Sequence, residues 1–424
     1  MPDYKRKKVK KSFLNKKKHK NAQQMNNIVM HNSSKKQPLV PSDDNIKVVR
    51  GAKLKRKRRL TLIASIAAFL VTLFIVLSIV LPVSVSENLV NLFAQAGQGS
   101  YPIKTSGTEI LNTASCGSYY YLLTDTNISV YSNGGKIIFS EQHGFENPII
   151  TVSETRALVF DQGGTEIQIY NLSGKIHSLK TENCIINADI SRSGGFAVVT
   201  DSADYTSTVD VYNKKFNKIY TWNSAKNFIN NIVLSSNGKK LAVSTLNATS
   251  GDFTTKVLIF NFESADPLHT IDLDNSIVLS FFDNNNGFSI ITSDKYRYVD
   301  WSDFKTKEIS SDGQIEVCRD SANGVLLVFN RTNDRSDNNV VLISNKGEKI
   351  SEFNINTIIT DIRFEKGRIY YVSDSIIYIL DNKGNVLRKN ATAYGTEQFA
   401  VTGTNSIAAV TTREIIKTEI EKED

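Results

Sequence analysis

The stretch "YYYLLTDTNISVYSNGGKIIFS", from Tyr119 to Ser140, contains the pattern that decides the fold. It has an apolar run, a polar corner, a second strand-like run ending in "VY", the turn "SNGGK" and a further apolar run. Turns favour Asn, Asp and Gly, and short apolar runs between such turns are typical of β-strands. The stretch therefore predicts three consecutive strands joined by tight turns.

The phrase that ends the second strand recurs along the chain, for example as "IYNLSGK", "LISNKGE" and "ILDNKGN". Its second apolar residue lies at Tyr131, Tyr170, Tyr212, Phe260, Val299, Ile343 and Leu380, and Ile416 continues the series. A period of about 40 residues made of short strands is the signature of β-propeller blades. A further strand, such as "PIITVS", precedes each unit, so each blade has four strands, labelled A to D from the centre outward.

These repeats predict an all-β fold, a β-propeller of about eight four-stranded blades over residues 101–424. The last repeat lacks a strand D of its own. The segment "YPIKTS", Tyr101–Ser106, precedes the first strand A and is predicted to supply that strand and close the ring. Seven blades with a trailing pair of strands remain the alternative.

An uncharged apolar run extends over the 22 residues from Leu60 to Leu81. This length suits a transmembrane helix, which needs about 20 residues, better than a signal peptide, whose apolar core has about 7–15. Lys and Arg are abundant just before the run and absent from the 20 residues after it. We therefore expect contact with the lipid bilayer through Leu60–Leu81, a cytoplasmic N-terminus, a linker over residues 82–100 and an extracytoplasmic propeller. A cleaved signal peptide remains the alternative.

The basic character of the chain is confined to its first segment. Residues 1–59 hold 20 of the 51 Lys and Arg residues and 3 of the 43 Asp and Glu residues, a net charge of +17. The remaining 31 basic and 40 acidic residues give −9. High charge with few apolar residues predicts a disordered cytoplasmic tail. Its composition favours topology control and contact with anionic lipid over nucleic-acid binding, because a bare Lys run has no base-reading side chains.

Several stretches resemble known propeller repeats. "IIYILDNKGNVLRK", Ile376–Lys389, is similar to quinoprotein-like units, and the repeated phrases resemble WD-repeat-like units. With "YLLTDTNISVYSNGGKIIFSEQHGFENPII" and "VVTDSADYTSTVDVYN", the chain resembles an uncharacterised family of Gram-positive bacteria. The resemblance implies a basic tail, one membrane helix and a propeller-like domain of unknown function. It supplies no active site.

The sequence has no recognisable catalytic, nucleotide-binding or calcium-binding motif. Cys116, Cys184 and Cys318 have no metal-site spacing, and each is expected to be a small core residue. We expect no cofactor and no metal site. We favour a binding or scaffolding module. A surface enzyme acting on cell-wall glycan and a transmembrane sensor that signals through the tail are the alternatives.

The corners between strands B and C differ in charge from the turns between strands C and D. Seven of the eight B–C corners carry Asp, whereas the C–D turns are rich in Asn, Gly and Lys. In a propeller, all B–C corners lie on one face. Three of them are long, Asp201–Thr208, Thr245–Lys256 and Asn330–Asn339, and long loops on a rigid scaffold often bind ligands. Ordinary turn chemistry is the alternative explanation for these aspartates.

The sequence therefore predicts a monomer whose acidic face binds a cationic protein or a cell-wall component. The candidate ligand-binding residues are Asp201, Asp204, Asp252, Asp334 and Asp337.

Overall fold

The computed structural model describes residues 58, 60–73, 99–105, 107, 109–249, 252–273, 275–332 and 334–421. The chain divides into two compact units, Met1–Phe74 and Ile75–Asp424. In the first unit, residues 60–73 are helical. No helix among the described residues has both the length and the apolar character that crossing a membrane requires. Residues 74–81 of the predicted span, the tail up to residue 57 and the predicted linker up to residue 98 lie outside the described residues.

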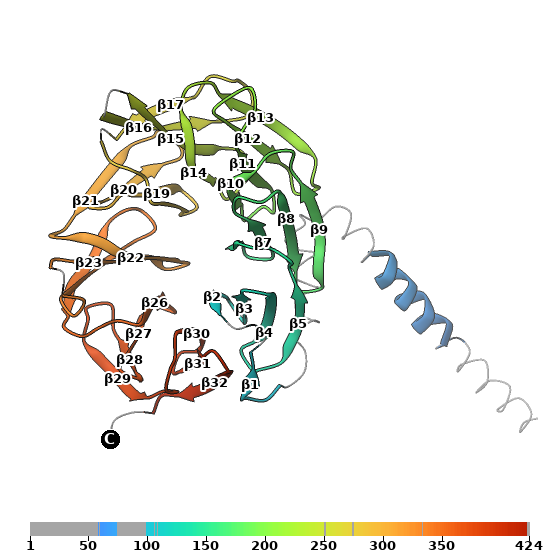
Figure 1. Cartoon of the computed structure of the whole chain (residues 1–424). Helices are drawn as coiled ribbons and strands as arrows, with labels where there is room; N and C mark the ends of the chain where they lie inside the picture. Colours follow the sequence, from blue (N-terminus) through green and yellow to red (C-terminus); the bar gives the residue numbers. More distant parts are fainter. Residues whose placement is uncertain are drawn as a thin grey trace, which may run out of the picture. The chain divides into compact units, whose positions relative to one another are not determined.

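The second unit contains a β-propeller of eight sheets, each with four antiparallel strands (Figure 1). The prediction of eight blades is confirmed, and the alternative of seven blades is wrong. Strands A lie nearest the axis in Figure 1, and strands D lie at the rim. The order of the strands along the chain matches their order from the axis outward in blades 1 to 7.

The strands at position A are β2 (Ile110–Cys116), β6 (Pro148–Val152), β10 (Ile185–Ile190), β14 (Phe228–Leu234), β18 (Ser280–Asp283), β22 (Gln314–Ser321), β26 (Asp361–Glu365) and β30 (Gln398–Gly403). Those at position B are β3 (Tyr119–Thr124), β7 (Ala157–Asp161), β11 (Phe196–Thr200), β15 (Leu241–Thr249), β19 (Gly287–Ile291), β23 (Gly324–Asn330), β27 (Arg368–Ser373) and β31 (Ser406–Val410). Those at position C are β4 (Asn127–Ser132), β8 (Glu166–Asn171), β12 (Ser207–Tyr212), β16 (Asp252–Phe260), β20 (Lys295–Asp300), β24 (Asn338–Ile343), β28 (Ile376–Leu380) and β32 (Glu414–Glu419). Those at position D are β5 (Ile137–Gln142), β9 (Gly174–Lys180), β13 (Lys218–Ser224), β17 (His269–Asp272), β21 (Thr306–Ser310), β25 (Lys349–Ile355), β29 (Val386–Ala391) and, in blade 8, β1 (Ile103–Lys104).

The hydrophobic core lies between the blades. Strands B are buried along most of their length, as in β3 and β23, where every residue is buried. Eight apolar clusters occur, one at each junction between neighbouring blades. A sheet packed on both faces needs apolar side chains on both, which explains the near-continuous apolar runs in the sequence.

The N-terminal strand closes the ring, as predicted. Ile103 pairs with Ile415 and Lys104 with Glu414, so β1 completes blade 8 beside β32. The backbone N–H of Thr105 donates to the Arg413 carbonyl oxygen over 3.1 Å. The strand is shorter than the predicted Tyr101–Ser106, because only Ile103 and Lys104 form ladder pairs.

The propeller has two faces with different loops. Antiparallel pairing places the B–C corners and the connections from strand D to the next strand A on one face, termed the B–C face. The A–B and C–D turns lie on the opposite face, termed the C–D face. The chain arrives at the C–D face, because Gly99 and Tyr101 pack against the C–D turn of blade 1. A Cβ at Gly135 in that turn would lie 2.7 Å from the Tyr101 ring, and the φ of Gly135 is +83°.

Candidate functional site

The predicted aspartates of blade 3 lie where the sequence placed them. Asp201 and Asp204 are exposed in the corner between β11 and β12 on the B–C face. Neither carboxylate has an ion-pair partner among the described residues. They are therefore free to meet a positively charged ligand.

In the B–C corner of blade 6, one of the predicted aspartates stabilises the loop that contains it. The Oδ1 atom of Asp334 accepts hydrogen bonds from the Ser336 backbone N–H over 2.9 Å and from the Ser336 hydroxyl over 2.8 Å. These bonds lower the pKa of Asp334. The backbone N–H of Asp337 donates to the Asp334 carbonyl oxygen over 3.0 Å. Asp334 thus supports its own loop, as the turn-chemistry alternative predicts.

The prediction of a long loop at Thr245–Lys256 in blade 4 is wrong. β15 and β16 are nine residues each, and their pairing runs out to Thr249 opposite Asp252. The Thr and Phe residues of this segment favour extended, paired strands over an open loop. Asp252 is therefore the first residue of a strand. The structure describes its backbone only.

The charge difference between the two faces extends beyond the corners that the sequence singled out. The described loops of the B–C face carry the acidic residues Glu109, Asp125, Glu146, Glu182, Asp201, Asp204, Asp294, Asp312, Asp334, Asp337, Asp374 and Glu397. Their basic residues are Lys226, Arg331, Arg335 and Arg413. The described loops of the C–D face carry the basic residues Lys136, Arg156, Arg192, Lys214, Lys215, Lys239, Lys240, Lys305, Lys346, Lys366 and Lys383. Their acidic residues are Glu154, Glu263, Asp266, Asp303, Glu348 and Asp381.

Exposed apolar side chains accompany the acidic residues on the B–C face, and sequence reasoning missed them. In blades 3 to 5 they are Tyr205, Phe228, Ile277 and Leu279, with exposed fractions of 44%, 41%, 43% and 53%. They belong to the corner of blade 3, to the start of β14 and to the connection between β17 and β18. Each adjoins an apolar strand, so the sequence alone gave no reason to separate them from the core.

Two hydrogen bonds show that these segments are neighbours. The Thr206 hydroxyl, beside Tyr205, donates to the Ala225 carbonyl oxygen over 3.2 Å. The Asn230 side-chain amide, two residues after Phe228, donates to the Val278 carbonyl oxygen over 2.9 Å. We term the surface formed by Asp201, Asp204, Tyr205, Phe228, Ile277 and Leu279 the acidic–apolar arc.

The hairpin of blade 4 stands beside this arc. Phe228, the first residue of β14, pairs with Leu246, and β15 continues beyond it to Thr249. The β15–β16 hairpin therefore projects past the inner strand on the B–C face. Its position beside Phe228 provides a wall for any molecule that contacts the arc.

A second group of charged residues lies on the inner strands and joins neighbouring blades. Asp361 of β26 is 4% exposed and accepts hydrogen bonds from Arg319 Nη2 of β22 over 3.3 Å and from Arg363 Nε over 3.0 Å. It also accepts one from the backbone N–H of Phe399 in β30, over 3.3 Å. This carboxylate thus connects blades 6, 7 and 8.

Asp189 of β10 makes a comparable connection between blades 3 and 4, since the Leu234 backbone N–H donates to its Oδ2 over 2.7 Å. Burial raises the pKa of Asp189 to about 6, and the nearby Asp283 carboxylate adds to this effect. Hydrogen bonds from backbone N–H groups and from Thr151 oppose it. The inner carboxylates are therefore engaged in holding blades together.

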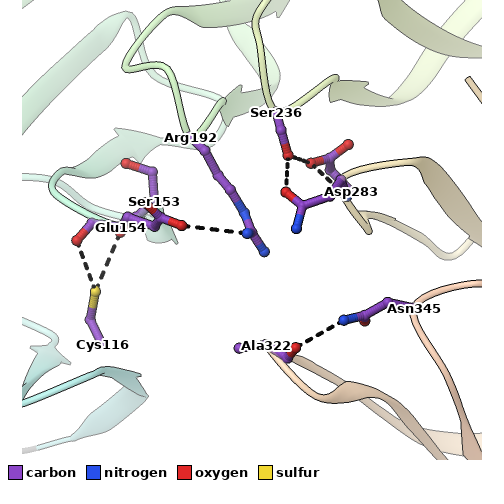
Figure 2. Close-up of polar contacts among 9 residues, drawn as sticks. Cys116, Ser153, Glu154, Arg192, Ser236, Asp283, Ala322 and Asn345 are labelled. Atoms are coloured by element: carbon purple, nitrogen blue, oxygen red, sulfur yellow. Dashed lines mark hydrogen bonds and ion pairs between the residues drawn. The ribbon is translucent and has the colours of Figure 1, made fainter. Parts of the chain in front are cut away.

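Figure 2 shows similar connections among residues of the A–B turns, the adjoining strands and the C–D turn of blade 6. Arg192 of blade 3 forms an ion pair with Glu154 of blade 2 over 3.4 Å. The Ser236 hydroxyl of blade 4 donates to the Asp283 carboxylate of blade 5. The Cys116 thiol of blade 1 donates to the Glu154 carbonyl oxygen over 3.3 Å. Six blades thus contribute residues to this region, and the side chains of Cys116, Glu154, Arg192, Ser236, Asp283 and Asn345 form the contacts drawn there.

The three cysteines are free thiols, and one differs from the prediction. Cys116 and Cys318 are partly buried, whereas Cys184 is exposed. Cys184 ends the connection from β9 to β10 on the B–C face, so its neighbouring apolar run did not determine its burial. Among the described residues, no group of three or more His, Cys, Asp or Glu side chains is placed to hold a metal ion.

Comparison with solved structures shows the same fold. A computationally designed protein, Ika8, has a TM-score of 0.56 and 12% identity, covering 76% of this chain and 100% of its own. Sqt1 from Saccharomyces cerevisiae has a TM-score of 0.52 and 10% identity, covering 76% and 99%. The C-terminal WD40 domain of Sif2 has a TM-score of 0.51 and 10% identity, covering 77% and 100%. The propeller is therefore WD40-like in architecture.

No curated protein sequence matches the chain. A family model does match, over residues 96–420, which include every strand of the propeller. The chain therefore belongs to the family of unknown function DUF5711.

Proposed function

We propose that this protein is a membrane-anchored binding module, with its propeller outside the cytoplasm and its B–C face bound to a cationic, partly apolar partner. The observation that carries the proposal is the acidic–apolar arc. Exposed carboxylates and exposed large apolar side chains occur together there on one face of the propeller. Apolar contact gives a partner area to bury, and acidic residues at its edge select Lys- or Arg-bearing partners.

The position of the arc agrees with the proposed anchor. The chain reaches the propeller on the C–D face, at the turn that contains Gly135. The B–C face, which carries the arc, is the face of the propeller opposite this point of entry. That arrangement leaves the arc accessible to another molecule at the cell surface.

The test compares two charge-neutralising variants of the full chain. Asp201→Asn with Asp204→Asn alters the arc, and Glu263→Gln with Asp266→Asn is the matched control on the C–D face. All four side chains are exposed, so both variants should retain the fold. Each protein is immobilised in nonionic detergent, and the partners it captures from a cell-surface extract are quantified over a salt gradient.

We expect the arc variant alone to retain less of the captured partner and to release it at lower salt, because exposed charges are screened over about 8 Å at physiological ionic strength. Phe228→Ser with Leu279→Ser should also reduce capture, with little change in salt dependence. If both variants of the arc capture the same partners as the unaltered protein, the acidic face is ordinary turn chemistry and the proposal is wrong.

A further inference from the structure

A groove of about 1080 Å³ lies on the C–D face, opposite the acidic–apolar arc. It runs over blades 4 and 5, where the A–B turn of residues 235–240 meets the C–D turn of residues 301–305. Residues 261–263 line a further part of the groove, and Lys346 reaches it from blade 6. Its volume is slightly above the range typical of ligand sites, about 300–1,000 Å³.

The groove is positively charged, and part of that charge has no counter-ion. Five lysines line it, Lys239, Lys240, Lys305, Lys307 and Lys346, and so do the three carboxylates of Glu263, Asp300 and Asp303, which leaves an excess of positive charge. Lys305 pairs with Asp303 over 2.6 Å, and Lys307 pairs with Glu348 over 3.2 Å. For Lys239, Lys240 and Lys346, no carboxylate among the described residues lies within ion-pair distance. These three ammonium groups are therefore available to an anion.

One of these lysines is held in position before any ligand arrives. Lys240 is partly buried, and its ammonium group donates to the carbonyl oxygen of Trp301. It also lies 5.1 Å from the centre of the Phe304 ring. Neither a carbonyl oxygen nor an aromatic face removes the positive charge. The side-chain entropy that a mobile lysine loses on binding is thus already lost on folding.

The floor that positions Lys240 is itself fixed by the junction between blades 4 and 5. The Trp301 indole N–H donates to Asp283 Oδ1 over 2.9 Å, and Asp283 accepts the Ser236 hydroxyl of blade 4, as Figure 2 shows for the latter pair. The Trp301 backbone N–H donates to the Asn286 carbonyl oxygen over 2.9 Å. The opposite wall is held as well, because Lys307 Nζ donates to the Lys346 carbonyl oxygen over 2.8 Å.

We propose that this groove binds a phosphate-bearing ligand, with the phosphate group between Lys239, Lys240 and Lys346. Ammonium groups bind phosphate as point charges, and several lining one groove suit an anion of more than one charge. The groove is larger than a single phosphate requires, which points to a phosphate carried on a longer molecule. Its source is either the headgroup of an anionic lipid or a soluble phosphate ester.

The two tryptophans of the chain allow binding to be observed at the groove itself. Trp222→Phe leaves Trp301 as the sole tryptophan, since the sequence has only two. The full chain with this change, in nonionic detergent, is titrated with inorganic pyrophosphate, with short-chain phosphatidylglycerol and with short-chain phosphatidylcholine. We expect a saturable change in Trp301 emission with at least one of the first two probes and none with the zwitterionic lipid.

Charge reversal then locates the anion. Lys239→Glu with Lys346→Glu should weaken binding by about tenfold or more, because each charged hydrogen bond contributes about 1.5–3 kcal/mol. Lys383→Glu is the control, since Lys383 is exposed on the same face in blade 7, outside the groove. A response to pyrophosphate assigns a soluble ligand, and a response to phosphatidylglycerol alone assigns a lipid headgroup.

Two outcomes would overturn the proposal. One is that the Trp222→Phe protein keeps the melting temperature of the unaltered protein but shows no saturable change in Trp301 emission with either phosphate probe. The other is an equal loss of binding in the Lys383→Glu control, which would indicate attraction to the basic face as a whole. Neither outcome bears on the acidic–apolar arc, which lies on the other face.

Discussion

Asp189 and Asp361 are both inner-strand carboxylates, but their surroundings differ. Asp361 lies between the guanidinium groups of Arg319 and Arg363. Asp189 is hydrogen-bonded to backbone N–H groups and to Thr151, and the pKa of its carboxyl is raised to about 6 by burial. The first should stabilise the propeller as an ion, whereas the second costs free energy when it ionises.

We expect Asp189→Asn to make the free energy of unfolding less dependent on pH. The pKa of Asp189 in the folded protein, about 6, exceeds its ordinary value of 3.8. Its stabilising contribution is therefore complete below about pH 4 and is lost as the pH rises through about 6. Asparagine stays neutral and keeps an oxygen that can accept from Leu234. Relative to the unaltered protein, the variant should gain up to about 3 kcal/mol between pH 4 and pH 7.5, because one pKa unit corresponds to about 1.4 kcal/mol.

The measurement is denaturant unfolding of both proteins at several pH values, followed by far-ultraviolet circular dichroism. A constant difference between the two proteins across this range would show that Asp189 titrates normally.

Asp361→Ala should destabilise the propeller strongly. It removes the acceptor for Arg363, whose side chain is only 13% exposed, and for the backbone N–H of Phe399. Leaving a buried charge without its partner typically costs about 3–5 kcal/mol. The exposed pair of Asp303 and Lys305 provides the control, and Asp303→Ala should change the unfolding midpoint little. Equal effects of the two substitutions would contradict a special role for the buried carboxylate.

For single residues, the sequence predicted charge and turn preference more accurately than it predicted solvent exposure. It identified Asp201 and Asp204 as exposed corner residues, because turn signals and charge are local properties. It could not identify Phe228 or Leu279 as exposed, because their exposure depends on where the neighbouring blade ends. Cys184 was misassigned to the core for the same reason.

Among the elements, the repeated phrases identified every blade, because each blade must present the same alternation of apolar strands and polar turns. The error in blade 4 arose from treating a polar stretch as a loop. Its two long strands continue to pair after Leu246 as far as Thr249, beyond the end of strand β14, where the sequence is mostly polar and gives no core signal. Strand β1 was found by elimination, but two ladder pairs are too few for local pattern to define its length.

Closure of the ring by β1 gives a prediction about stability. Deleting Tyr101–Ser106 removes Ile103, which is buried in the cluster between blades 8 and 1, and leaves the edge of β32 unpaired. Loss of the buried isoleucine alone should cost about 2 kcal/mol or more, and an unpaired edge promotes association. We expect a lower melting temperature and larger particles by light scattering.

Ile137→Ala is the control for this deletion, because Ile137 lies on the outer strand of blade 1 and is half exposed. It should change the melting temperature little. A deletion variant that keeps the particle size and the melting temperature of the unaltered protein would show that β1 does not contribute to closure.

For the whole molecule, the antiparallel order of strands sorts loops onto two faces, and composition gives those faces opposite charge. The sequence was sufficient to predict this difference in charge, since the order of the strands alone assigns each loop to a face. It was insufficient for the groove on the C–D face. That groove needs Lys239, Lys346 and Trp301, from three blades, to converge, and no periodic pattern encodes such an arrangement.

The proposed topology has a test that uses a native side chain. Cys184 is an exposed free thiol on the B–C face, whereas Cys116 and Cys318 are partly buried. If the apolar run of residues 60–81 anchors the chain with its basic flank inside, a membrane-impermeant maleimide should label Cys184 on intact cells after any wall has been removed. Cys184→Ser should lose most of this label. Adding Ser33→Cys to that variant places a thiol in the basic tail, which should react only after the membrane is permeabilised. Labelling of residue 33 on intact cells would reverse the orientation, and a propeller released into the medium without residues 1–81 would show that the apolar run is a cleaved signal.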